Sequence, residues 1–64
     1  MGSIEKAIEA AYQAHISSLY KVLSKSLLSA KGDASEVAAA ESRFKKGLEF
    51  AADVQSKARA VAGL

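Results

Sequence analysis

Apolar residues recur every three or four positions along both halves of the chain. In the first half they are Ile4, Ile8, Tyr12, Ile16, Leu19, Leu23, Leu27 and Ala30. In the second half they are Val37, Ala40, Phe44, Gly47, Ala51, Val54, Ala58 and Val61. Steps of three and four place such residues on one side of an α-helix, and in the second half they form a regular heptad repeat. The pattern therefore predicts two amphipathic helices.

A short stretch between the two periodic segments carries the residues that end one helix and begin the next. Gly32 can adopt the left-handed backbone conformation that terminates a helix. Asp33 can cap the following helix, and Glu36 can bond back to the cap, as in a capping box. Because so short a turn brings consecutive helices together, we expect them to pack antiparallel.

These signals define the boundaries of the predicted elements. We expect a first helix over residues 4–31 with Ser3 as its N-cap, a turn over 32–34 and a second helix over 34–62. The fold class is therefore all-α. Residues 1–64 are predicted to form a single coiled-coil-like helical hairpin, which completes a helical bundle by dimerisation or with a partner.

The apolar side of each predicted helix is wider than one helical neighbour can cover. In both helices the bulky apolar side chains span an arc of about 160° at 100° per residue. We predict an internal seam made of Ile8, Tyr12, Leu19, Leu23, Phe44, Leu48 and Ala51. We predict a partner-binding surface made of Tyr20, Phe50, Val54 and Val61. Soluble monomers seldom expose large apolar strips, so the pattern indicates binding to a protein partner or to another copy.

Length and composition support this interpretation. A chain of 64 residues without cysteine forms at most one marginally stable core, and it has no disulfide to reinforce that core. Oligomerisation or a partner is then the usual source of stability. Because there is no membrane-length apolar run and no basic-then-apolar leader, we expect a cytoplasmic protein without a membrane span.

Groups that could carry out catalysis are scarce. His15 is the only histidine, and there is no thiol, so neither a paired metal ligand nor an activated nucleophile is available. We expect no catalytic, cofactor-binding or metal-binding residues, and no enzymatic activity. His15 itself is either a partly buried structural residue or a pH-sensitive residue of an interface.

The basic residues raise a second class of function. Lys21 and Lys25 lie near several serines, and Lys45 and Lys46 form a doublet in the second helix. A formal net charge of +2 is small for a nucleic-acid binder, and there is no interleaved arginine. Nucleic-acid binding is therefore disfavoured. A homodimeric RNA-binding hairpin and a filament or assembly subunit are the alternatives to a protein-binding hairpin.

A family resemblance follows from the turn and the second helix. The stretch 23–34, Leu-Ser-Lys-Ser-Leu-Leu-Ser-Ala-Lys-Gly-Asp-Ala, and the ending 60–64, Ala-Val-Ala-Gly-Leu, resemble the YscE-type proteins of type III secretion systems. The resemblance implies a cytoplasmic hairpin that acts as a needle co-chaperone. Such a protein pairs with a tetratricopeptide-like chaperone, and together they keep the needle subunit from polymerising early.

Overall fold

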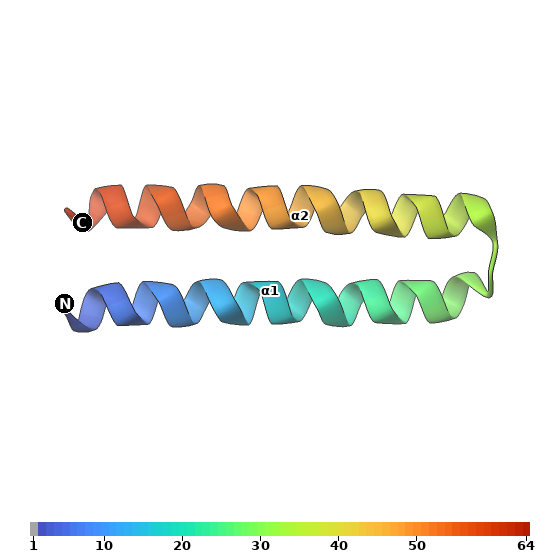
Figure 1. Cartoon of the computed structure of the whole chain (residues 1–64), viewed down its shortest axis with the longest axis horizontal. Coiled ribbons are helices and arrows are strands. Elements are labelled where there is room, and N and C mark those ends of the chain that lie inside the picture. The colour runs from blue at the N-terminus through green and yellow to red at the C-terminus, as the bar shows by residue number, and fades with distance from the viewer. Residues whose placement is uncertain (1) are drawn as a thin grey trace.

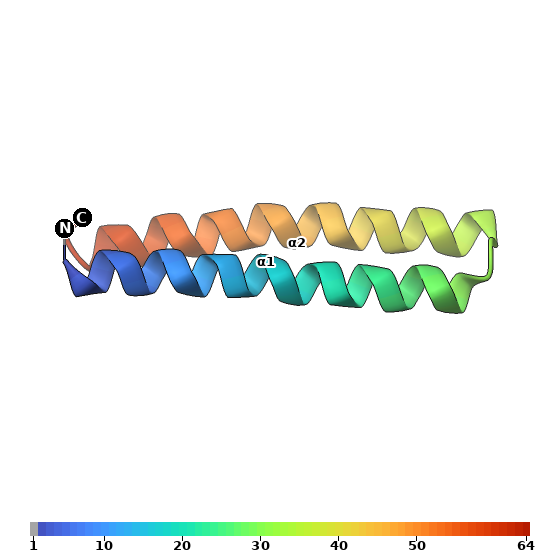
Figure 2. The same cartoon turned by 60° about the horizontal axis from the view of Figure 1, so that its bottom comes forward.

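The computed structural model describes residues 2–64 as two long helices joined by a tight turn (Figure 1). Helix α1 comprises Ser3–Ala30 and helix α2 comprises Ala34–Val61, with 28 residues each. The helices pack antiparallel along their whole length, and residues 2–64 contain no strand (Figures 1 and 2). The predicted all-α helical hairpin is confirmed. The observed helix ends differ from the expected ones by one residue at most, and Met1 lies outside the described residues.

The beginning of α1 differs from the prediction. Gly2 occupies the N-cap position with an extended backbone (φ −98°, ψ 166°), and no side chain caps the helix. The predicted cap at Ser3 is wrong because Ser3 already has helical geometry, where it no longer precedes the free N–H groups of the first turn. Glu5 supplies the favourable negative charge of that turn.

The turn follows the prediction closely. Gly32 takes a left-handed conformation (φ 82°), and Lys31 before it does so as well (φ 50°). The carboxylate of Asp33 accepts a hydrogen bond of 3.1 Å from the backbone N–H of Glu36, so Asp33 caps α2. The N–H of Asp33 donates to the carbonyl oxygen of Ala30 at 2.9 Å. This hydrogen bond replaces the predicted one, in which the Glu36 side chain would bond back to the backbone of Asp33.

The most deeply buried positions of the seam between the helices are small residues. Within residues 2–64 the fully buried hydrophobic side chains are those of Ala30, Ala40 and Ala51. A methyl group added at Gly47 would lie only 2.6 Å from Cδ2 of Leu19, so this glycine lets the helices come close together. The residues predicted for the internal seam are all partly or fully buried: Ile8, Tyr12, Leu19, Leu23, Phe44, Leu48 and Ala51.

The hairpin is elongated. Its principal extents are 45 × 15 × 10 Å, and its radius of gyration is 14.8 Å. A compact domain of this length would have a radius of gyration of about 11 Å. Both termini lie at the end opposite the turn (Figures 1 and 2). Two helices side by side leave two broad faces along the length of the molecule, to which both helices contribute.

Candidate protein-binding face

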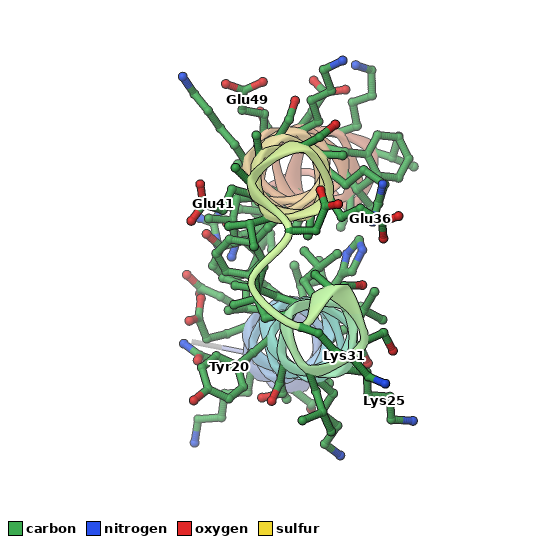
Figure 3. All side chains as sticks on the ribbon, turned by 90° about the vertical axis from the view of Figure 1, so that its right-hand side faces the viewer. Tyr20, Lys25, Lys31, Glu36, Glu41 and Glu49 are labelled. Carbon is green, nitrogen blue, oxygen red and sulfur yellow. The ribbon has the colours of Figure 1, made fainter. Side chains whose placement is uncertain are left out.

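Figure 3 views the hairpin along its helices and separates the two broad faces. Lys25 and Glu36 lie on one side, which we name the cleft face, and Tyr20 and Glu41 lie on the other, which we name the tyrosine face. Phe50 follows Glu36 by two heptads, so it belongs to the cleft face. The two faces differ in their polarity and in how tightly the helices close against each other.

The half of the cleft face nearest the termini contains an apolar opening between the helices. The rings of His15 and Phe50 pack edge to face, with centroids 6.2 Å apart and an interplanar angle of 86°. Beside them is a shallow cleft of about 150 Å³. Its lining residues are Ile8, Ala11, Tyr12, His15, Ala51, Val54, Gln55 and Ala58. The opening is therefore bounded mainly by apolar side chains from both helices.

A ridge of exposed apolar side chains runs along α2 at the edge of this cleft. Phe50, Val54 and Val61 retain 61%, 42% and 91% of their accessible surface. Val61 follows Val54 by one heptad and so continues the same stripe. Val22 and Ile4 of α1 are also exposed and lie five full helical turns apart, at the same angle on α1. They enlarge the apolar surface, although they are not among the predicted partner-binding residues.

The end of the cleft face nearest the turn is polar. A second shallow depression there is lined by Lys25, Ser26, Ser29, Glu36 and Arg43. Between this depression and the middle of the molecule, Val22 lines another small cleft with Leu19, Leu23, Ser26, Ala40, Arg43 and Phe44, which is mainly apolar. The exposed ridge of α2 is confined to the terminal half of the face, but apolar surface also extends past the middle toward the turn.

On the tyrosine face, polar side chains connect the two helices at the terminal end. Gln55 Nε2 donates to Glu9 Oε1 at 3.1 Å, and Gln13 Nε2 donates to Glu9 Oε2 at 3.0 Å. Nearer the termini, Arg59 Nη1 lies 3.5 Å from Glu5 Oε2. Exposed ion pairs contribute little stability. These hydrogen bonds and the ion pair nevertheless make the tyrosine face polar near the termini, where the cleft face is apolar and open.

The structure does not bring all four predicted partner-binding residues together. Phe50, Val54 and Val61 share the cleft face, but Tyr20 lies on the tyrosine face, where it is 66% exposed. The two faces lie on opposite sides of the helix pair. A single partner helix that contacts Phe50 and Val54 would therefore not reach Tyr20.

Other chemistry finds little support in the described part of the chain. Among residues 2–64 there is no group of three or more His, Cys, Asp or Glu side chains placed to hold a metal ion. Neither helix contains a stretch long and apolar enough to cross a membrane. Lys25 shares its depression with an acidic residue, Glu36, and Lys45 and Lys46 diverge by about 100° around α2. These basic residues do not form one continuous basic surface.

The accessible surface of the chain is large for its mass. It amounts to 4794 Å², whereas a folded monomer of 6.7 kDa exposes about 3,900 Å². The excess of about 900 Å² is close to the area of about 800 Å² that one partner buries in a standard protein interface. The hairpin thus exposes roughly one interface more than a compact chain of its size.

Comparisons with family models, curated proteins and solved structures found no match to this chain. The resemblance to YscE-type proteins consequently rests on the turn and the second helix alone. The function has to be inferred from the two faces themselves.

Proposed function

We propose that this chain is a protein-binding hairpin without enzymatic activity, which joins a larger helical assembly through its cleft face. The observation that carries the proposal is the exposed ridge of Phe50, Val54 and Val61 beside an open apolar cleft. An apolar ridge and cleft of this kind is what an amphipathic helix binds.

The cleft also explains how binding would occur. A partner helix lying along it would insert apolar side chains at positions i, i+4 and i+7 between Val54 on one side and Ala11 and His15 on the other. Fully burying a side chain such as valine or phenylalanine is worth about 1.5–3 kcal/mol. The ridge therefore provides a substantial part of the free energy of association.

The finer form of the proposal is a needle co-chaperone of a type III secretion system. In that role the hairpin would bind a tetratricopeptide-like chaperone and help to hold the needle subunit in soluble form. Its support is the resemblance of the turn and second helix to YscE-type proteins. RNA binding and filament formation have no comparable feature in residues 2–64, because the basic residues are dispersed and the exposed apolar ridge occupies only half of one face.

Site-specific photo-crosslinking in cells that express the chain tests the proposal. A photoreactive amino acid is placed at Val54, in the cleft face, and in a matched control at Leu28, which is 80% exposed elsewhere on the surface. We expect discrete protein adducts from position 54 and none of comparable yield from position 28. Equal adducts from both positions, or none from position 54, would exclude the cleft face as a binding site.

A further inference from the structure

We propose that the cleft face binds a second copy of this chain, and that a two-fold axis parallel to the helices relates the two copies. This inference rests on the proposed function, because it names the partner of the same face. It goes further by specifying the symmetry, the orientation and the side chains that interlock.

The terminal half of the cleft face consists of a ridge on α2 and a trough on α1. The ridge is formed by Phe50, Val54 and Val61. The trough is formed by Ala7, Ala11 and Ala14, which recur at steps of four and three along α1 and are all exposed. Phe50 and Val54 thus stand on α2 beside small side chains of α1, whereas Val61 is level with the larger Ile4.

Ridge and trough lie at matching heights along the hairpin. The contact between His15 and Phe50 fixes the level of Phe50 beside Ala14, the neighbour of His15 in the chain. The shared cleft fixes the level of Val54 beside Ala11. A two-fold axis parallel to the helices leaves heights unchanged and places α1 of one copy over α2 of the other. Each ridge then rests in the trough of the other copy, as self-complementary packing in a symmetric dimer requires.

The same operation also suits the polar end of the face. Lys25 of one copy comes near Glu36 of the other, because both residues lie near the turn end of the cleft face. Every helix is then antiparallel to its neighbours in a four-helix bundle, so the helix dipoles oppose each other favourably. Charge and dipole arrangement both agree with the interlocking of apolar side chains.

The other two-fold arrangements fit less well. An axis perpendicular to the helices, with full overlap, places Val54 and Val61 of one copy against the polar end of the other, which contains Lys25 and Glu36. Desolvating such groups without good partners is unfavourable. A staggered overlap of the two terminal halves avoids this contact, but it buries only about half of the ~800 Å² per copy that stable interfaces use.

Sedimentation equilibrium of the purified full chain, combined with distance measurements, tests the proposal. The chain contains no cysteine, so a spin label can be attached to a single introduced cysteine, either by Leu64→Cys at the terminal end or by Ser35→Cys at the turn end. Parallel pairing predicts that both labels are on the order of 15–25 Å from their mates, given interaxial distances of 8–10 Å. A perpendicular axis would separate at least one label pair by about the 45 Å length of the hairpin.

A compensating pair of substitutions tests the interlocking itself. Phe50→Ala removes the largest side chain of the ridge, and Ala14→Phe fills the trough at the same level, so each alone should weaken dimerisation at least tenfold. The double variant moves the phenyl ring from α2 to α1, and we expect it to recover most of the lost affinity. Leu28→Ala removes a similar apolar side chain outside the interface and should leave the dimerisation constant unchanged.

Three outcomes would overturn the proposal: a monomeric mass at hundreds of micromolar, a dimer whose labels lie far apart, or single variants that dimerise like the parent chain. Circular dichroism of each variant at high concentration verifies that the helices form. If the chain is monomeric while position 54 still cross-links to another protein in cells, self-association is wrong and the proposed function stands. If neither is observed, both are wrong.

Discussion

Replacing Gly47 with alanine sets two effects of similar size against each other. In the interior of a helix, alanine is favoured over glycine by about 1 kcal/mol. At this position the new methyl group would lie 2.6 Å from Cδ2 and 3.2 Å from Cδ1 of Leu19. Such overpacking costs about 1–3 kcal/mol. We therefore expect Gly47→Ala to change the free energy of unfolding by between zero and about 2 kcal/mol in the destabilising direction.

A second substitution separates the two effects. Leu19→Val removes both Cδ atoms that the new methyl group would strike. In that background Gly47→Ala should stabilise the fold by about 1 kcal/mol, so the double-mutant cycle should give a coupling energy of about 1–3 kcal/mol. Urea unfolding followed by circular dichroism, at one fixed protein concentration, measures each corner of the cycle. A coupling energy near zero would refute the close approach of the helices at Gly47.

Four further predictions follow from the turn and the faces. Gly32→Val should lower the free energy of unfolding by about 1 kcal/mol or more, whereas Gly63→Val, at a similar φ of 81° beyond the end of α2, should change it little in the same urea titration. Asp33→Ala should cost about 1 kcal/mol through loss of the cap, while Asp33→Asn should nearly preserve the melting temperature. The melting temperature of the parent chain should rise over a hundredfold increase in its concentration, and a constant value would contradict linked association. Structured RNA should bind no more tightly than about 10⁻⁴ M at physiological salt, and a tighter affinity that falls on Lys21→Gln and Lys25→Gln would instead support RNA recognition.

The turn was predictable because its signals are local. Gly32 and Asp33 have properties that few other residues share, and both lie within the three residues that connect the helices. The left-handed conformation of Lys31 has no such signal, because lysine does not favour it. The cap at Ser3 was predicted wrongly, because a serine one residue inside a helix looks the same in sequence as a serine at its boundary.

The faces were less predictable, because they depend on how the two helices pair. Val54 and Val61 continue the heptad repeat of α2, yet Gln55 is the more buried side chain at the seam. A straight helix drifts about 20° per heptad, so residues that begin in the seam rotate out of it. Tyr20 and Phe50 are both bulky residues at the edge of an apolar arc. Only the register of α1 against α2 determines that these two edges lie on opposite faces.

The location of both termini at one end has a mechanical consequence (Figures 1 and 2). Tension applied to the two chain ends would act across the helix axes and not along them. It would load the pair Glu5 and Arg59 first and then peel the helices apart one layer at a time toward Gly32. Because the contacts between the helices would break a few at a time and not all together, the hairpin would open at low force. The fold is therefore poorly suited to transmitting load through its chain ends.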